Sequence, residues 1–413
     1  MVRENASRAG ELVAEPVDLT EEFFRNPHAV YGRLRGRGAV HFVRFPDAST
    51  GWLITGYEAA KQVFADPSIS KDLGSAGARE AVANGSSRYV DNSVFVDMMV
   101  FHDPPEHTRL RALVNRAFGS RAVRDMEVRV TEVADTLLAN LAGRAGEVQD
   151  LLEGYAFPLG MLLICELLGV PHEDRDRFWD WSRILMSGNE TRDTRSASVQ
   201  EFADYIDKLV RTKSAAPGQD VLSELIAARE GGDRLTHQEL ISMVFVLLVA
   251  GFETTVNLIG NAVAKLLTDK DSRQLLCDDP DRMAAFVEEV LRYRSPTRET
   301  TFRYTTTPVT VAGTDIPAGQ IIVVSVAAAN RDPHRFTDAD HFDLTRPDNQ
   351  HIAFGHGIHH CVGAPLARME GAVALARLLA EYPDLELDES VRLEWRKSLV
   401  IRGFTTVPVR LRP

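Results

Sequence analysis

The pattern of hydrophobic and polar positions predicts a helical body with short β segments near both ends of the chain. From about residue 104 to residue 294, apolar positions recur at helical spacing, and glycine or proline separates the segments. Short runs rich in β-branched and aromatic residues lie between about residues 31 and 63 and again after Pro296. The sequence shows no repeat and no linker rich in glycine, serine or proline. We therefore expect one domain over residues 1–413, mainly α with minor β.

The individual segments follow from the same pattern. The predicted helices are 122–141, 151–168, 198–212, 240–264, 281–294 and 363–381. The predicted strands are 40–44, 52–55, 301–303, 309–311, 321–324, 399–402 and 406–410. Two irregular segments, 71–100 and 187–196, are equally well explained as binding loops or as mobile surface loops.

The helix at 240–264 is unusually apolar and carries a single formal charge, Glu253. Twenty-five such residues would be long enough to span a bilayer. However, Glu253, Thr254, Thr255, Asn257 and Asn261 lie in its middle and C-terminal half, where lipid would make them costly. We expect a helix enclosed by protein and no membrane span.

Composition narrows the class of protein. Hydrophobic residues make up 44% and charged residues 26% of the 413 positions, which excludes disordered and collagen-like chains. A net charge of −12 argues against binding nucleic acid or anionic lipid as a whole. Three cysteines cannot form a disulfide framework, and residues 1–18 read as a flexible polar tail without a signal peptide. A cytoplasmic location is expected.

The strongest local signal is the segment 354–368, where Cys361 lies among glycines just before a predicted helix. A helix N-terminus stabilises a thiolate through its dipole and its free N–H groups. Glycines such as Gly357 and Gly363 let the backbone approach a bulky planar ligand. The pattern therefore suits a thiolate that ligates a metal and receives backbone hydrogen bonds.

Two other interpretations of this cysteine are possible. A zinc cluster would draw on His351, His356, His359, His360 and Cys361. Its spacing fits no usual zinc pattern, and no second cysteine is near. A buried structural thiol is the other alternative. That alternative is preferred for Cys165, which lies in an apolar run, whereas Cys277 carries no signal.

The segment resembles the haem-binding signature of the haem-thiolate monooxygenases, the cytochrome P450 family. Phe354, Gly357, Cys361 and Gly363 fill the fixed positions of its Phe-x-x-Gly-x-x-x-Cys-x-Gly pattern. The resemblance implies haem b as cofactor, with Cys361 as the axial ligand to the iron and Phe354 and Gly363 beside it. It also implies the family's fold: a triangular helical body with a long central helix over the haem, and small β-sheets.

A second motif lies within the apolar helix, Ala250-Gly-Phe-Glu253-Thr254-Thr255. Taken alone, it favours a satisfied buried glutamate with a glycine packing contact. The resemblance identifies it with the family's acid–alcohol pair on the haem face opposite the thiolate. Ala250 would then line the haem, Thr254 would hydrogen-bond the activated oxygen, and Glu253 would relay protons from solvent.

A third motif is Glu289-x-x-Arg292, whose spacing puts both side chains on one helix face. Alone, such a pair is usually solvated and contributes little. The resemblance makes it the structural ion pair behind the haem, with Arg346 as the third member. Glu288 also precedes Arg292 at a suitable spacing, so the choice of Glu289 rests on the resemblance.

A fourth group of residues is implied to bind the haem propionates. Pro104 and Pro105 mark a helix start, after which His107 and Arg111 share a face. Without context this would be an ordinary solvated basic face. The resemblance implies that His107 and Arg111 hold a haem propionate, and that Arg303 and His359 also bind the propionates. Four such groups around two carboxylates make chemical sense.

The function implied is insertion of one atom of O2 into an organic substrate. Soluble bacterial members take electrons from a ferredoxin, which an NAD(P)H-dependent ferredoxin reductase reduces. The surface on the cysteine side should then be basic, although a plain solvated helix face is an equal alternative. The candidate arginines are Arg109, Arg116, Arg121 and Arg124. No membrane and no nucleic acid partner is expected, and the protein is expected to be a monomer.

The resemblance also places substrate contacts. They would come from the segment 71–100, the helix around Phe245, the segment 297–301 and the turn 401–404; the individual candidates are Val246, Val249, Thr297, Arg298 and Ile401. Small apolar side chains suit a bulky apolar substrate but are also expected of a core. Arg298 would pair with an acidic or carrier-linked group if it points inward, and a surface position is an equal alternative.

The substrate expected is a secondary metabolite such as a macrolide or polyketide, altered by hydroxylation or epoxidation. A steroid or terpenoid is the alternative substrate. Oxidative coupling or desaturation, peroxide-driven catalysis, and a non-catalytic haem sensor are the alternative activities. Glu253 and Thr254 argue against the last two.

Overall fold

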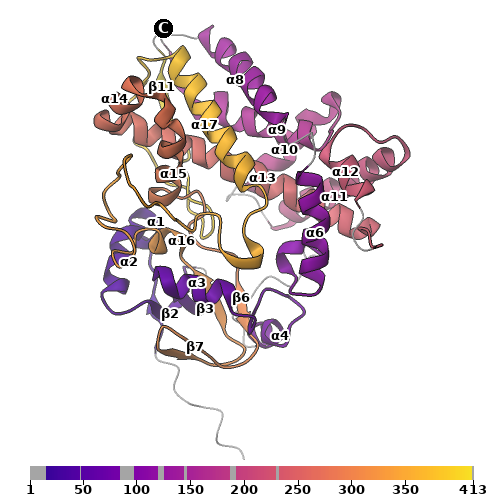
Figure 1. The fold of residues 1–413 in the computed structure, drawn as a ribbon, viewed down its shortest axis with the longest axis vertical. Coiled ribbons are helices and arrows are strands. Elements are labelled where there is room, and N and C mark those ends of the chain that lie inside the picture. The colour runs from indigo at the N-terminus through magenta and orange to yellow at the C-terminus, as the bar shows by residue number, and fades with distance from the viewer. Residues whose placement is uncertain are drawn as a thin grey trace, which may run out of the picture.

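The structure, a computed structural model, describes residues 15–46, 48–83, 97–119, 125–143, 147–186, 192–228 and 232–411. Helices form most of it. Two of the small β-sheets gather with the N-terminal helices at one end, and strand β11 (Pro408–Arg410) of the third sheet lies at the opposite end (Figure 1). The predicted fold class, mainly α with minor β, is confirmed.

The α-helices are α1 (Glu22–Arg25), α2 (Pro27–Arg35), α3 (Tyr57–Ala65), α4 (Ala76–Ala83), α6 (Glu106–Phe118), α8 (Met126–Ala142), α9 (Phe157–Leu167), α10 (Arg175–Met186), α11 (Arg192–Ala215), α12 (Val221–Ala227), α13 (His237–Thr268), α14 (Lys270–Asp278), α15 (Met283–Tyr293), α16 (Val326–Ala329) and α17 (Ala364–Glu381). Single 3-10 turns are η1 (Met99–Phe101), η3 (His172–Asp174), η4 (Pro280–Arg282) and η5 (Gly357–His359), and η2 (Leu152–Ala156) is a π-helix that leads into α9.

Helix α13 crosses the centre of the helical body and packs against α9, α11, α15 and α17 (Figure 1). It begins with a capping box, in which Thr236 and Glu239 each accept a hydrogen bond from the other's backbone N–H. Among the described residues it is the one helix long and apolar enough to cross a membrane, but 61% of its most apolar window is buried in protein. It is the central core helix, as its sequence predicts.

The strands form three small sheets. The largest has the order β1-β2-β3-β9-β6-β4, and the other two are β10-β11-β5 and β7-β8. Their bounds are β1 (Val17–Asp18), β2 (Val40–Arg44), β3 (Thr50–Ile54), β4 (Ile69–Ser70), β5 (Val148–Asp150), β6 (Arg303–Thr305), β7 (Val309–Val311), β8 (Thr314–Ile316), β9 (Ile321–Val324), β10 (Glu386–Leu387) and β11 (Pro408–Arg410). Because β6 brings Arg303 beside β4, the sheet carries that arginine toward the segment after Ser70.

The structure corrects three segment predictions. Part of the expected loop at 71–100 is helix α4, which is rich in alanine, while residues 84–96 lie outside the described part. Residues 192–196 belong to helix α11, and 187–191 of that expected loop are likewise outside it. Residues 399–402 form a single bridge, Thr297 to Ile401, rather than a strand. Pro296 has no N–H to continue that pairing.

Candidate active site

Cys361 lies between η5 and α17, just before the N-terminus of that helix, as the sequence predicts. Its backbone N–H donates to the Phe354 carbonyl at 2.9 Å. Burial raises the pKa of the Cys361 thiol, and the backbone N–H groups of Gly363 and Ala364 oppose this by hydrogen bonding the sulfur. The exposed part of Cys361 faces a cavity rather than the outer surface. The loop thus presents one sulfur, with backbone donors behind it, to that cavity.

Gly357 shows why the loop needs glycine. Its φ is +73°, in the left-handed region, and a Cβ there would come 2.9 Å from the Phe64 carbonyl oxygen of α3. The loop can therefore pack directly on the end of α3 only without a side chain at this position. Phe354 closes the other side, where the Arg368 guanidinium lies 4.5 Å from its ring centre.

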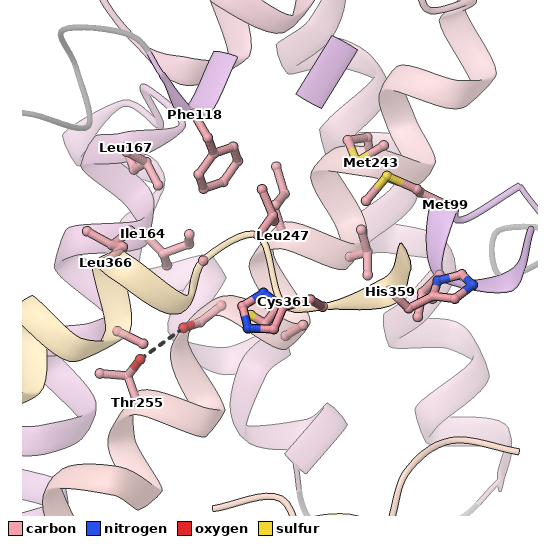
Figure 2. A pocket seen from close by; sticks show the side chains of 18 of the residues that line it. Met99, Phe118, Ile164, Leu167, Met243, Leu247, Thr255, His359, Cys361 and Leu366 are labelled. Carbon is pink, nitrogen blue, oxygen red and sulfur yellow. Dashed lines mark hydrogen bonds between the residues drawn. The ribbon is translucent and has the colours of Figure 1, made fainter. Parts of the chain in front are cut away.

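The cavity lies between the cysteine loop and α13, and its space, counted together with the open solvent at its mouth, is about 1010 Å³. Figure 2 shows side chains from several segments pointing into it. Its lining includes Met99, Ile164 and Leu167, the α13 residues Met243, Val246, Leu247, Ala250, Gly251 and Thr255, and the loop residues His359, Cys361 and Gly363. Apolar helix faces opposite a single thiol make a slot that fits a flat, largely apolar cofactor.

A cluster of basic groups adjoins the cavity, and two of its members, His107 and His359, line it. His107 lies 4.2 Å from His359, ring centre to ring centre, and its buried Nε2 atom has no hydrogen-bond partner among the described residues. Arg303 and Lys71 are also buried. Burial lowers the pKa of His107 to about 4, of His359 to about 2 and of Arg303 to about 10, and it lowers that of Lys71 well below its ordinary value.

The negative charge of Asp103 raises the pKa values of His107, Arg303 and Lys71, and so partly offsets the effect of burial. An unpartnered buried imidazole nitrogen beside two buried cations is costly unless an anion completes the site. The two propionates of a haem b would supply such an anion. The residues present therefore fit the cofactor that the sequence implies.

Lys71 is a residue that the sequence reasoning missed as a member of this cluster. Its Nζ donates to Thr301 Oγ1 at 2.7 Å, and its backbone N–H donates to the Asp103 carboxylate. Only the pairing of β4 with β6, far apart in sequence, places Lys71 near Arg303. Arg111 lies on the cysteine side of the same cavity, where it donates to the His360 carbonyl at 2.7 Å.

Across the cavity from the cysteine loop, helix α13 carries the predicted acid–alcohol pair in its middle. Thr254 Oγ1 donates to the Ala250 carbonyl at 2.9 Å. The Glu253 carboxylate lies 3.6 Å from an Arg396 guanidinium nitrogen. Burial raises the pKa of Glu253, and Arg396 opposes this. Ala250 and Thr255 line the cavity, whereas Glu253 and Thr254, between them on α13, are not among its lining residues.

A second buried acid, Glu370 on α17, also lines the cavity, and the sequence reasoning missed it. Burial raises its pKa to about 8, and a hydrogen bond with the Thr255 hydroxyl opposes this. The helical period was the available signal, because Glu370 falls on the same face as Leu366 and Ala367.

Behind the cysteine loop, Arg292 pairs with Glu289 at 2.7 Å, and both side chains are fully buried. Arg346 approaches the same carboxylate at 3.4 Å. Glu288, the other candidate by spacing, pairs instead with Arg368 at 2.6 Å. The structure therefore brings together Glu289, Arg292 and Arg346.

The five candidate substrate residues are placed differently from one another. Val246 lines the cavity, whereas Val249, Thr297 and Ile401 are outside its described wall. Arg298 is neither in the cavity nor on the surface, which corrects both alternatives: it pairs with Glu299 at 2.5 Å, donates to the Phe23 carbonyl at 3.1 Å and stacks on that ring. Arg298 is buried because its ion-pair partner Glu299, the next residue in the sequence, is itself buried.

Comparisons with known proteins agree with this geometry. The family model described as Cytochrome P450 matches residues 162–398. Cytochrome P450 107B1 of Saccharopolyspora erythraea is 44% identical, over 96% of this chain and 98% of its own. The vitamin D(3) 25-hydroxylase of Pseudonocardia autotrophica is 42% identical, over 95% of each.

Solved structures agree as well. The ligand-free P450 monooxygenase TamI superposes with a TM-score of 0.86 at 40% identity, over 96% of this chain and 94% of that one. Sequence and structure therefore match across nearly the full length, including the cysteine loop and α13. The chain is a haem-dependent monooxygenase of the cytochrome P450 family.

Proposed function

We propose that the enzyme inserts one oxygen atom from O2 into a bulky apolar secondary metabolite of the macrolide or polyketide class, by hydroxylation or epoxidation. The observation that carries this proposal is the apolar wall of α13 facing Cys361 across the cavity. Two relatives support the substrate class: a 6-deoxyerythronolide B hydroxylase is 39% identical and a mycinamicin IV hydroxylase/epoxidase 37% identical.

Cys361 would bind the haem iron through its sulfur, and Phe354, Gly363 and Ala250 would pack against the cofactor. When bound, the haem supplies the activation of O2. The propionates would be held by His107, Arg111, Arg303 and His359, with Lys71 as an additional donor. His107 Nε2 would gain the hydrogen-bond partner it lacks.

The chain's own chemical task is then proton delivery. Glu253 would take a proton from water and hold it on its carboxyl group. Thr254 would receive it at Oγ1 and pass on its hydroxyl proton, after turning that hydroxyl from the Ala250 carbonyl toward the cavity. The apolar lining would exclude other water, so protons would arrive along this route.

Electrons require a redox partner in this family, and we propose a ferredoxin reduced by an NAD(P)H-dependent reductase. Arg116 is a candidate for this contact, because it is exposed on α6, which flanks the cysteine loop. Arg109 contributes less than expected, because Glu106, Asp233 and Glu239 surround it. Arg121 and Arg124 lie outside the described residues. A cytoplasmic monomer is part of the proposal.

The test is the absorbance difference spectrum of the reduced protein with and without carbon monoxide. The long-wavelength Soret band of a thiolate-ligated haem is expected, and Cys361→Ala should lose it. Macrolides would then be screened for a shift in the spin state of the haem iron. Product analysis of those that cause a shift would identify the substrate. A wild-type band in Cys361→Ala would overturn the ligand assignment, and failure of every macrolide to shift the spin state would overturn the substrate class.

Steroid-like molecules are the second candidate substrate class, because the relative at 42% identity is named a vitamin D(3) 25-hydroxylase. The same spin-state screen separates the two classes when vitamin D(3) is included beside the macrolides. Product analysis would also distinguish hydroxylation or epoxidation from coupling or desaturation. Activity with hydrogen peroxide but none with ferredoxin and O2 would instead indicate a peroxide-driven enzyme.

A further inference from the structure

The C-terminal hairpin, residues 395–404, is built around stacked rings. Trp395 and Phe404 stack with ring centres 3.9 Å apart, and the Arg402 guanidinium lies 4.0 Å from the Trp395 ring centre on its face. The Arg396 N–H donates to the Gly403 carbonyl at 2.9 Å. The backbone around Arg396 is therefore held in one place by its neighbours in the hairpin.

Two asparagines of α13, one turn apart, hold this hairpin against the helix. Asn261 Nδ2 donates to the Arg402 carbonyl at 2.9 Å. Asn257 packs on Gly403, where any side chain would overlap its amide oxygen. Asn257 Nδ2 also donates at 2.7 Å to the carbonyl of Glu253. The hairpin is thus held at the level of the proposed proton-relay residues.

At this level Arg396 comes within 3.6 Å of the Glu253 carboxylate. The Arg396 side chain is 29% exposed and that of Glu253 16% exposed, so the pair lies where solvent meets the protein interior. Glu253 is the single formal charge in the stretch 240–264. Among the described residues, Arg396 is the charged group that acts on it, and its α13 neighbours Thr254 and Asn257 are neutral.

We propose that Arg396 is a positioning residue for oxygen activation: it holds the Glu253 carboxylate toward solvent, where the acid takes up protons. This inference rests on the proposed relay role of Glu253. When water protonates the carboxylate, the attraction to Arg396 weakens, and the neutral carboxyl group turns to Thr254. Passing the proton on restores the carboxylate, which returns to Arg396.

The direction of the effect follows from charge. Burial alone would keep Glu253 protonated to a higher pH, and the nearby cation opposes this. Removing the cation should therefore slow the return of Glu253 to its charged form and move its titration to higher pH. A lysine at position 396 would keep the charge and should preserve much of the effect.

The experiment compares wild type with Arg396→Gln, Arg396→Lys and Glu253→Gln, all as haem-loaded protein. Lys397→Gln is the matched control, because Lys397 lies next to Arg396 in the hairpin but pairs with exposed Glu21 at 3.0 Å. The probe reaction is NADPH-driven O2 reduction with a plant-type ferredoxin and its reductase, in H2O and in D2O, across about pH 5.5 to 9. Infrared difference spectra follow the protonated Glu253 carboxyl band, identified by its loss in Glu253→Gln.

In Arg396→Gln, we expect the infrared midpoint to rise by about one pH unit, equivalent to a tenfold change in proton affinity. The solvent isotope effect on O2 reduction should increase as well. Arg396→Lys should lie close to wild type, and Lys397→Gln should match it. A lower unfolding midpoint in Arg396→Gln without these two changes would show a purely structural role and overturn the inference.

The Glu253→Gln variant separates this inference from the role on which it rests. If it leaves the rate and the isotope effect as in wild type, the relay role of Glu253 is wrong. If it changes both while Arg396→Gln changes neither, Glu253 is a relay but Arg396 does not position it.

Discussion

Asn257 and Gly403 are in contact at a point where a hydrogen atom fits and a methyl group does not. The amide oxygen of Asn257 occupies the space that a Cβ on Gly403 would need. Gly403 is not in the left-handed region, so close approach rather than backbone conformation accounts for its glycine. The contact ties the C-terminal hairpin to the turn of α13 that carries Glu253.

Gly403→Ala should therefore destabilise the protein. The added methyl group would push Asn257 away and strain its hydrogen bond to Glu253, and overpacking of this kind costs about 1–3 kcal/mol. Denaturant unfolding measures the loss. Gly32→Ala on α2 is the matched control, because a Cβ there meets no atom of the described part of the chain within 4 Å. Equal stability of Gly403→Ala and wild type would contradict the contact.

The buried ion pair behind the cysteine loop gives a second prediction. Glu289→Ala would leave the Arg292 guanidinium buried, although that group keeps its bonds to the Asn330, Ala339 and His341 carbonyls. Removing one partner of such a pair costs about 3–5 kcal/mol. The same unfolding experiment on Glu22→Ala, whose pair with Arg33 is exposed, should show no measurable change. A similar loss in both variants would show that burial does not matter here.

Local signals explain why the sequence predicted the core of the site. Four residues within ten positions predict the cysteine loop, and a long apolar stretch with a single formal charge predicts α13. Glu253 and Thr254 lie within that run, so predicting the helix also located them. Such features depend on neighbours along the chain, which the sequence displays directly.

Partners distant in sequence could not be predicted in the same way. Spacing alone does not distinguish Glu288 from Glu289 as the partner of Arg292, and the local pattern allows Arg298 to lie either in the pocket or on the surface. Arg298 is instead buried with Glu299, a pair also contacted by Tyr31 of α2. Lys71 joins the basic cluster through strand pairing. Each outcome depends on which elements pack together, and that is decided by the whole fold.

Thr254→Ala should leave haem binding intact but divert electrons to hydrogen peroxide. The variant lacks the hydroxyl group that would hand protons to the activated oxygen, so reduction would stop early. Peroxide formed per NAD(P)H consumed measures the diversion. Thr131→Ala is the control, because Thr131 makes the same hydroxyl-to-carbonyl bond on α8, away from the cavity. An unchanged peroxide yield in Thr254→Ala would rule out its proton-relay role.

Lys71→Met should weaken haem retention without changing the thiolate spectrum. The substitution keeps an apolar side chain of similar length but removes a buried cation that we place beside a propionate. A charge-assisted hydrogen bond contributes about 1.5–3 kcal/mol, so haem should dissociate about 10- to 100-fold faster. Transfer of haem to an acceptor protein measures the rate. Lys61→Met, at an exposed lysine of α3, should retain haem like wild type.

Glu370 makes stability depend on pH. Its pKa is about 8 in the folded protein, against an ordinary value of 4.5. The folded state therefore keeps a proton that the unfolded chain releases, and stability is lost as pH rises from about 4.5 to about 8. Glu370→Gln removes this titration. The variant should gain about 2–5 kcal/mol relative to wild type between about pH 5 and pH 8.

Denaturant unfolding of wild type and Glu370→Gln, each at about pH 5 and about pH 8, measures this gain. The gain is the change in unfolding free energy of one protein between the two pH values minus that of the other. Glu381→Gln on the same helix is the control, because Glu381 is exposed and should give the wild-type pH dependence. The Thr255 hydroxyl can donate to a charged Glu370 carboxylate but also accept from its neutral form. The hydrogen bond from Thr255 lowers the pKa of Glu370. Because Thr255→Val removes this bond, the variant should lose more stability than wild type as the pH rises. Identical slopes in wild type and Glu370→Gln would show that Glu370 does not hold the proton.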